Sequence, residues 1–183
     1  MDRIRKYVAL NGVGVLSRVN EFGVSSLMIS AKEGHYEVYQ YLIDKGAFYK
    51  DEIIHKSDDL MDGMDLITLA LVGGNIKIVN QILNSGVSVN SRNLKDGNTL
   101  IHYASRSCRP DILKLLLERG APVNAINIEG NTAAHTSVSH NCLSCLKLLK
   151  EGGVNLSVKN RNQKIAQDLI SSRDESEELR TYI

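Results

Sequence analysis

Gly97-Asn98-Thr99-Leu100-Ile101-His102-Tyr103-Ala104 is the stretch that decides the fold, because the chain repeats it. A matching octet, Gly130-Asn131-Thr132-Ala133-Ala134-His135-Thr136-Ser137, begins 33 residues later. Positions beyond the two octets keep the same offset, as three pairs show: Ile112 with Cys145, Leu116 with Leu149, and Gly120 with Gly153. Self-similarity at a fixed period predicts a repeat architecture, in which each unit packs against its neighbours.

Two more copies lie upstream. Gly63-Met64-Asp65-Leu66-Ile67-Thr68-Leu69-Ala70 begins 34 residues before the first octet, and Gly23-Val24-Ser25-Ser26-Leu27-Met28-Ile29-Ser30 begins 40 residues before that. Each copy is followed by a second segment with apolar residues at positions i, i+4 and i+5, which predicts a short amphipathic helix. These stripes are Val38, Leu42 and Ile43; Ile78, Ile82 and Leu83; Ile112, Leu116 and Leu117; and Cys145 and Leu149.

The unit resembles the ankyrin repeat, whose pattern is roughly G-x-T-P-L-H-x-A-A-x-x-G-H, an apolar helix, and then G-A-x-V-N. The match is fullest in the third copy, at Thr99, Leu100, His102, Ala104 and Gly120-Ala121-Pro122-Val123-Asn124. The other copies keep parts of it: Gly34-His35 and Gly46-Ala47; Gly74-Asn75 and Gly86-Val87-Ser88-Val89-Asn90; and Thr132, Ala134 and His135. This resemblance implies an all-α ankyrin-repeat solenoid of about four full repeats, with capping half-repeats at both ends and short hairpin-like loops between repeats.

We therefore expect a single ankyrin-repeat domain over residues 1–183. Its predicted parts are, in order, N-terminal capping helices at 1–20, repeat one at 21–60, repeat two at 61–94, repeat three at 95–127, repeat four at 128–160 and a C-terminal cap at 161–183. In the C-terminal cap, residues 165–170 resemble the first helix of a closing repeat, and residues 174–182 form a charged segment. A solenoid needs such polar outer faces, so we expect a complete chain.

The copies depart from the family pattern at the start of the first helix. In the family the Thr caps this helix and the His braces the turn by hydrogen bonding. Repeats three and four keep both residues, whereas repeat one has Ser25 and Met28 there and repeat two has Asp65 and Thr68. Because stability in a solenoid is nearly a sum over repeats and their interfaces, we expect the N-terminal half to open first.

The 40-residue spacing places about seven extra residues in an extended loop at 47–62, which contains Phe48 and Tyr49. Long loops are uncommon in compact domains and are often functional, because they project from a rigid scaffold. The alternative is a segment with an extra helical turn, in which Ile53 and Ile54 simply cover the core. The sequence leaves both interpretations open.

Composition argues against several classes of partner. The 183 residues include 22 basic and 21 acidic side chains, so the net charge of +1 gives no field that attracts nucleic acid or an anionic membrane. The apolar runs are far shorter than the roughly 20 residues of a membrane helix, and no secretory signal is evident. Three cysteines agree with a reducing compartment. We expect a cytoplasmic or nuclear monomer without a small-molecule substrate.

The strongest candidate for chemistry is a zinc set of His135, His140, Cys142 and Cys145, since C-x-x-C with nearby histidine can ligate that metal. The repeat register gives His135, Cys142 and Cys145 structural roles instead. Cys108 stands where the family has glycine and approaches Cys142 across the stack, and we expect two free thiols there. Phosphate-loop and hydrolase motifs are absent from the sequence, so we predict no enzyme, no cofactor and no metal.

The resemblance also implies a binding surface made of the hairpin tips and the exposed ends of the first helices. By register these positions are Phe22, Val24, Lys32, Glu33, Met61, Met64, Val72, Lys95, Asp96, Asn98, Arg106, Ile128, Glu129 and His140. Exposed apolar residues are typical hot spots, and here they fall in the first two repeats. We expect a partner protein to be anchored there, with Lys95 and Arg106 adding electrostatic fit.

The function that follows is a stand-alone adaptor or inhibitor that masks a partner surface. The alternative is a zinc- or thiol-dependent activity centred on Cys142 and Cys145. Two further motifs carry weaker predictions. The Val-Asn pairs, such as Val123-Asn124, resemble hairpin asparagines that are hydroxylated in some ankyrin proteins, but a structural role in the hairpin is favoured. Thr181-Tyr182-Ile183 fits a C-terminal motif that binds PDZ-type grooves.

Overall fold

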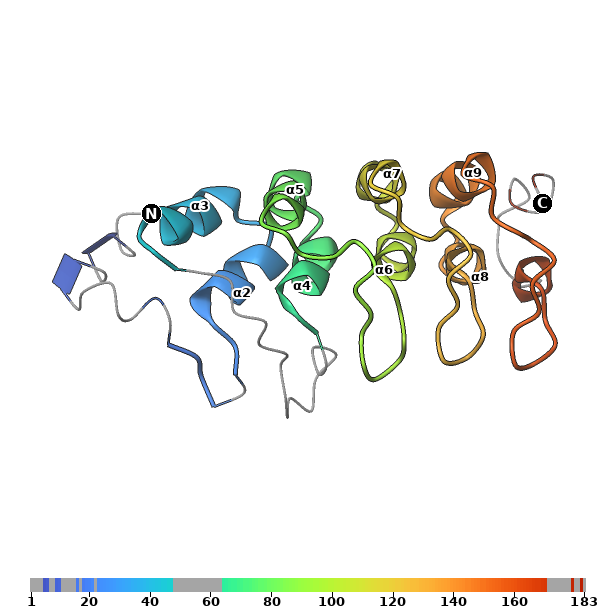
Figure 1. The fold of residues 1–183 in the computed structure, drawn as a ribbon, viewed down its shortest axis with the longest axis horizontal. Helices are drawn as coiled ribbons and strands as arrows, with labels where there is room; N and C mark the ends of the chain where they lie inside the picture. Colours follow the sequence, from blue (N-terminus) through green and yellow to red (C-terminus); the bar gives the residue numbers. More distant parts are fainter. Residues whose placement is uncertain are drawn as a thin grey trace. The chain divides into compact units, whose positions relative to one another are not determined.

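The computed structural model describes residues 5–6, 9–10, 16, 18–21, 23–47, 64–170, 179 and 182. The chain divides into two compact units, Met1–Gly86 and Val87–Ile183, and each is described by itself. Across the described ranges there are eight α-helices and no β-strand (Figure 1). None of the helices in these ranges is long and apolar enough to cross a bilayer.

The first unit contains two helix-turn-helix pairs. They are α2 (Ser26–Lys32) with α3 (Tyr36–Asp44), and α4 (Leu66–Gly73) with α5 (Ile76–Asn84). The first helices of the two pairs, α2 and α4, pack against each other, and so do the second helices, α3 and α5. The extended loop predicted at 47–62 begins at Ala47, which is buried, and the rest of it lies outside the described residues.

The second unit repeats the same arrangement. Its pairs are α6 (Leu100–Arg106) with α7 (Pro110–Glu118), and α8 (Ala133–Ser139) with α9 (Leu143–Glu151). Helix α6 packs on α8, and α7 on α9. The closing-repeat helix expected at 165–170 is a single 3-10 turn, η2 (Ala166–Leu169), which packs on α8. Isolated antiparallel bridges, Arg92 with Thr99 and Ile126 with Thr132, close the predicted hairpin-like loops.

The predicted apolar stripes form the core of each unit. Their central members are at most 2% exposed: Leu42, Ile78, Ile82, Ile112, Leu116, Cys145 and Leu149. The outer members Val38, Ile43 and Leu117 are only half-buried, because they lie at the edge of the stripe. The single-domain prediction for 1–183 stays a prediction, since the boundary between the two units falls at Gly86, inside the predicted repeat two.

The turn between the helices of each pair needs one residue with positive φ. Gly34 and Gly74 supply it in the first unit, with φ of 68° and 72°. Cys108 and Asn141 supply it in the second unit, with φ of 46° and 52°. Non-glycine residues pay a steric cost of about 1 kcal/mol in this conformation. The register prediction that Cys108 occupies a glycine position is therefore confirmed.

A polar side chain caps the first helix of each pair. Ser25 Oγ accepts from Met28 N at 3.2 Å, and Asp65 Oδ1 accepts from Thr68 N at 2.9 Å. In the second unit Thr99 Oγ1 lies 2.8 Å from His102 Nδ1, and Thr132 Oγ1 lies 2.9 Å from His135 Nδ1. The first two repeats thus keep a cap and lack only the histidine.

Each of these histidines also holds the next hairpin. His102 Nε2 lies 2.9 Å from the carbonyl oxygen of Asn131, and His135 Nε2 lies 3.1 Å from that of Lys164. A carbonyl oxygen can only accept, so Nε2 carries a proton. The backbone N–H groups of Thr99 and Thr132 donate to Nδ1, so each imidazole is the neutral form with Nδ1 as acceptor. Burial lowers the pKa of His102 from its ordinary value, which favours this neutral form. The expected bracing role of the histidine is thereby confirmed.

Candidate functional site

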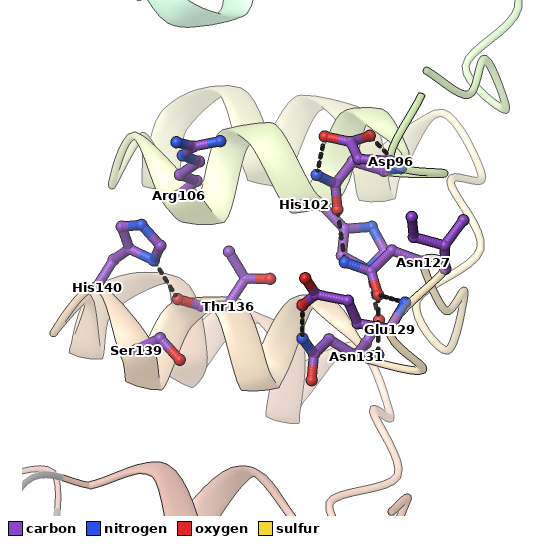
Figure 2. Close-up of a pocket in the computed structure, with 11 residues that line it drawn as sticks. Asp96, His102, Arg106, Asn127, Glu129, Asn131, Thr136, Ser139 and His140 are labelled. Carbon is purple, nitrogen blue, oxygen red and sulfur yellow. Dashed lines mark hydrogen bonds between the residues drawn. The ribbon is translucent and has the colours of Figure 1, made fainter. Parts of the chain in front are cut away.

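A groove of about 370 Å³ runs along the second unit, between the first helices α6 and α8 and the hairpins that precede them (Figure 2). Its hairpin end is lined by Asp96, Asn98, Asn127, Ile128, Glu129 and Asn131. Its helix end is lined by His102, Arg106, Thr136, Ser139 and His140. Polar side chains dominate both ends, so the groove suits a hydrogen-bonding segment rather than an apolar one.

The acidic side chains at the hairpin end are held in place. Asp96 Oδ1 accepts from Asn98 N at 2.8 Å, and its Oδ2 accepts from Asn98 Nδ2 at 2.6 Å and from the Tyr103 hydroxyl at 3.3 Å. Glu129 Oε2 accepts from Asn131 Nδ2 at 2.8 Å. Burial, with the Asp96 charge added to it, raises the pKa of Tyr103 above its usual range, so this hydroxyl remains a donor to Asp96. The two carboxylates therefore present ordered negative charge.

Asparagine side chains join successive hairpins. Asn127 Nδ2 donates to Asn98 Oδ1 at 3.0 Å, and Asn160 Nδ2 donates to Asn131 Oδ1 at 2.8 Å. Asn127 Oδ1 also accepts from the backbone N–H groups of Glu129 and Asn131, each at 3.0 Å. Sequence reasoning did not identify this ladder. The signal was available, because Asn recurs at positions 93, 127 and 160 and at 98 and 131 with the repeat period.

The helix end of the groove carries the basic side chains. Arg106 lies in the last turn of α6 and is exposed. His140 caps the C-terminus of α8, is also exposed, and donates from Nδ1 to the Thr136 carbonyl at 3.0 Å. Cations are favoured at helix C-termini, where carbonyl groups point outward. Figure 2 shows Arg106 and His140 at one end and Asp96 and Glu129 at the other, so the positive charge of Arg106 lies at the opposite end of the groove from the two carboxylates.

The groove gathers most of the residues predicted for the third and fourth repeats. Asp96, Asn98, Arg106, Ile128, Glu129 and His140 all line it. Ile128 is 50% exposed, which makes it a large apolar contact within a polar surface. Lys95 is exposed on the same hairpin as Asp96 but is not among the lining residues. The role of these groove residues and of Lys95 in binding a partner stays a prediction.

The residues predicted for the first two repeats have mixed positions. Phe22 and Met61 lie outside the described residues. Lys32 and Met64 are half-buried, Glu33 is exposed and Val72 is 36% exposed. Helices α2 and α4, which pack together, each expose one large apolar side chain, since Ile29 is 51% exposed and Val72 lies on α4. Sequence reasoning missed Ile29, because the same octet position is buried in the second and third copies, at Leu69 and Tyr103.

The prediction that Val24 is exposed on the binding surface is wrong. Its side chain is 6% exposed and belongs to the core of the first unit. The cause is local: Val24 N donates to Asn20 Oδ1 at 2.9 Å, and its carbonyl accepts from Asn20 N at 3.1 Å. These two bonds close a tight hairpin that turns the valine inward. Val24 is therefore a core residue and not one of the exposed apolar residues that the register predicted.

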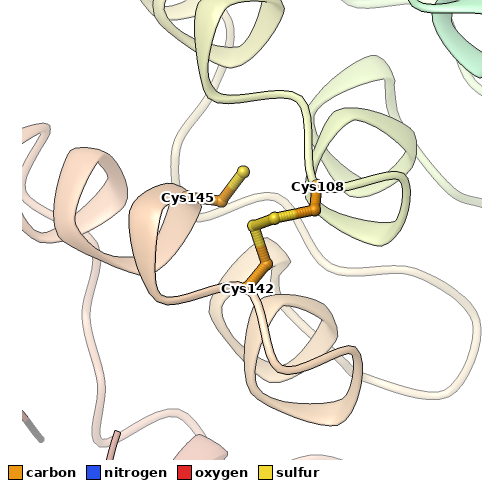
Figure 3. A group of neighbouring side chains, drawn as sticks. All are labelled: Cys108, Cys142 and Cys145. Carbon is orange, nitrogen blue, oxygen red and sulfur yellow. A yellow bond between two sulfur atoms is a disulfide. The ribbon is translucent and has the colours of Figure 1, made fainter. Parts of the chain in front are cut away.

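The cysteines differ from expectation in one respect. Cys108 and Cys142 do meet, with Cα atoms 5.4 Å apart, but they form a disulfide, so the prediction of two free thiols is wrong (Figure 3). The positive φ of Cys108 and the position of Cys142 just before α9 give the separation that a disulfide needs. Cys145 is free and buried, and burial raises its pKa to about 11.

The four residues weighed as a candidate zinc set do not come together as one site. Both nitrogens of His135 are engaged, by Thr132 and by the Lys164 carbonyl, and His140 lies in the groove. Among the described residues, the metal-type donors that do cluster are Cys108, Cys142 and Cys145, whose sulfur atoms lie within 4.8 Å of one another. Two of these three sulfurs are committed to the disulfide.

Two smaller predictions can be compared with the structure. Asn124 Oδ1 accepts from Asn155 N at 2.7 Å, which confirms a structural role for this Val-Asn pair. At the C-terminus, Thr181 and Ile183 lie outside the described residues. Tyr182 packs on α9 instead, with Lys147 and Lys150 over its ring at 5.5 Å and 4.6 Å and Lys150 Nζ donating to its carbonyl at 3.1 Å.

Comparison with known proteins identifies the family. The family model for ankyrin repeats in three copies matches residues 50–127 and 66–160. The Arabidopsis thaliana E3 ubiquitin-protein ligase KEG is 29% identical over 152 residues, which are 82% of this chain and 9% of that protein. A fowlpox virus ankyrin repeat protein is 29% identical over 117 residues, 64% of this chain and 33% of that protein.

A third relative is NF-kappa-B inhibitor zeta of Mus musculus, 22% identical over 196 aligned residues that cover 88% of this chain and 27% of that protein. The chain thus spans a third or less of the length of these relatives. The family match covers more than half of the chain, and the paired helices, the capped starts and the bridged hairpins agree with it. The chain belongs to the ankyrin-repeat family, whose repeats are protein-interaction modules.

Proposed function

We propose that this chain is a non-catalytic adaptor or inhibitor that binds another protein and masks part of its surface. The observation that carries the proposal is the groove between α6 and α8, where ordered carboxylates at one end face Arg106 and His140 at the other. Side chains that are already fixed by hydrogen bonds lose little conformational entropy when a partner binds. A relative named as an inhibitor, NF-kappa-B inhibitor zeta, supports the inhibitory form of this proposal.

The charges of the groove define the partner segment. An extended polar segment with a basic residue near Asp96 and Glu129 and an acidic residue near Arg106 complements both ends. Ile128, half-exposed at the hairpin tip, adds an apolar contact. In the first unit, Ile29 on α2 and Val72 on α4 offer apolar contacts of the kind that anchor partners, so we retain the predicted role of repeats one and two.

A zinc- or thiol-dependent activity centred on Cys142 and Cys145 has less support. Cys142 is bonded to Cys108, and the buried Cys145 has a pKa near 11, so little thiolate is present at neutral pH. Nucleophilic catalysis requires an accessible thiolate beside a base. The state of these cysteines therefore supports the binding proposal over a thiol-dependent activity.

Charge reversal in the groove tests the binding proposal. Once affinity capture and mass spectrometry have identified a partner, Arg106→Glu and Glu129→Arg are each expected to weaken its binding by about tenfold, because each places like charges against the complementary segment. Lys114→Glu is the matched control, since Lys114 is exposed on α7 and lies outside the groove lining. Undiminished binding by both groove variants, measured by titration calorimetry, would contradict the proposal.

A further inference from the structure

The two sulfur atoms of the disulfide belong to residues with different access to solvent. Cys108 lies in the turn between α6 and α7 and is exposed, whereas Cys142 is 0% exposed. Thiol–disulfide exchange requires an incoming thiolate to reach one sulfur and displace the other. An external thiolate can therefore approach Cys108 and is excluded from Cys142 by the surrounding protein.

The leaving sulfur is buried, and two neighbouring groups offset part of the cost that burial imposes on its negative charge. Cys142 is the N-cap residue of α9, a nine-residue helix, and a helix N-terminus stabilises a thiolate there. Ser144 Oγ lies 3.5 Å from Cys142 Sγ and 3.7 Å from Cys108 Sγ. The serine hydroxyl is thus beside both sulfurs and can donate to the one that leaves. A better-stabilised leaving thiolate departs faster.

The surroundings of Cys108 also favour an anionic attacker. Arg106 and Arg109 flank it in the sequence, and Asp111 follows on α7. Arg109 Nε is buried and has no hydrogen-bond partner among the described residues. Two arginines and one aspartate within three residues of Cys108 give this part of the chain a net positive charge, and positive charge raises the local concentration of small anions. Small thiols that carry carboxylates therefore fit this site better than cationic ones.

Cys145 does not compete as an internal attacker. Its side chain is fully buried, and burial raises its pKa to about 11, so it stays in the thiol form at neutral pH. Its sulfur lies 3.9 Å from the Ala104 carbonyl oxygen, to which the thiol donates. Exchange within the cluster is therefore disfavoured relative to attack from solvent.

We propose that Cys108 is a reversible S-thiolation site for a small anionic thiol of the glutathione class. The thiolate attacks Cys108 Sγ, a new S–S bond forms between them, the Cys108–Cys142 bond breaks, and its electron pair leaves on Cys142 Sγ as a thiolate. One disulfide replaces another, so no external oxidant or reductant is consumed. In the reverse step the Cys142 thiolate attacks Cys108 Sγ and expels the small thiol.

Peptide mass spectrometry of the purified, non-reduced protein tests the site. Thiol counting should first find one free cysteine, Cys145, that reacts with iodoacetamide only after denaturation. After treatment with glutathione and acid quenching, the adduct is expected on Cys108, with Cys142 newly open to alkylation. An adduct on Cys142 or Cys145, a Cys142–Cys145 disulfide, or no reaction would overturn the proposal. Three free thiols or stoichiometric zinc before treatment would overturn it as well.

Two sets of variants test the chemistry. Ser144→Ala should slow the reaction several-fold if its hydroxyl assists the leaving thiolate, whereas Ser157→Ala, exposed in a later loop, should not.

Arg106→Gln and Arg109→Gln should lower the ratio of the glutathione rate to the cysteamine rate, and Lys114→Gln should leave that ratio unchanged. Comparing each variant's ratio with that of the wild type cancels the intrinsic reactivity of the two thiols, so an unchanged value in both arginine variants would refute selection of anionic thiols.

Discussion

Gly73 shows how one residue sets the distance between two helices. A Cβ atom added there would lie 2.6 Å from the Lys32 carbonyl oxygen and closer still to that of Ala31, both of which are backbone atoms at the end of α2. Backbone cannot move aside as a flexible side chain can. The close packing of α4 on α2 therefore depends on the absence of a side chain at this position.

Gly73→Ala should destabilise the first unit. We expect a loss of about 2 kcal/mol or more, because the added methyl group forces the two helices apart. Urea denaturation followed by circular dichroism measures this loss. Gly152→Ala is the matched control: its added Cβ would meet nothing closer than 3.3 Å, so a loss below about 1 kcal/mol is expected. Equal losses in the two variants would show that the close approach is not the cause.

His102 gives the second unit a pH-dependent stability. Its folded pKa lies below the ordinary value of 6.5, so the unfolded chain binds the proton more readily than the folded one. The stabilisation is complete above pH 6.5 and is lost as the pH falls from there to the folded pKa. Thermal melts between pH 7.5 and pH 5 should show a falling melting temperature. His102→Gln should reduce this slope, and an unchanged slope would contradict the assignment.

At the scale of elements, the sequence predicted the four helix pairs and their buried stripes, because the period and the apolar spacing depend only on local sequence. It did not predict the inward turn of Val24 or the exposure of Ile29, since both depend on how one hairpin or helix packs against its neighbour. The asparagine ladder was missed for a different reason. Its bonds join residues that are 29 positions apart in successive hairpins, and only the repeat register reveals them.

The disulfide shows the same limit. Register alone placed Cys108 near Cys142, but bond formation also depends on the positive φ of Cys108, which sets the direction of its side chain. The sequence predicted most of the individual groove residues. It did not predict the groove itself, which forms where α6 packs on α8. The negative end of the groove could not be predicted, because the hydrogen bonds within the hairpins fix the positions of Asp96 and Glu129.

Removing the disulfide should destabilise the second unit. The bond closes a loop with a sequence separation of 34, for which the loss of chain entropy in the unfolded state predicts about 4 kcal/mol. We expect Cys108→Ser to lose about this amount, and reduced wild-type protein to match it. Cys108→Gly should recover about 1 kcal/mol relative to serine, because glycine adopts positive φ without strain. Denaturation curves that coincide for oxidised protein and Cys108→Ser would contradict the expectation.

For the whole molecule, the two units differ in what holds their repeats together. The second unit has two histidines bonded to following hairpins, an asparagine ladder and a disulfide between its two helix pairs. In the first unit a side-chain bond between the two pairs joins Asn75 Nδ2 to the Gly34 carbonyl at 3.0 Å, and neither pair has the bracing histidine or the disulfide. In a repeat protein such terms add nearly independently, so the units should differ in stability.

We therefore expect the first unit to open before the second. Amide hydrogen exchange should be faster in α2 to α5 than in α6 to α9, and limited proteolysis should cut on the N-terminal side of Gly86 first. A first cut beyond Gly130 would contradict this order. Repeating both measurements on the reduced protein separates the causes: the order should persist with a smaller difference, because the histidine and asparagine bonds remain when the disulfide is gone. If the second unit opened first after reduction, the histidine and asparagine bonds would not account for its greater stability, and the disulfide alone would.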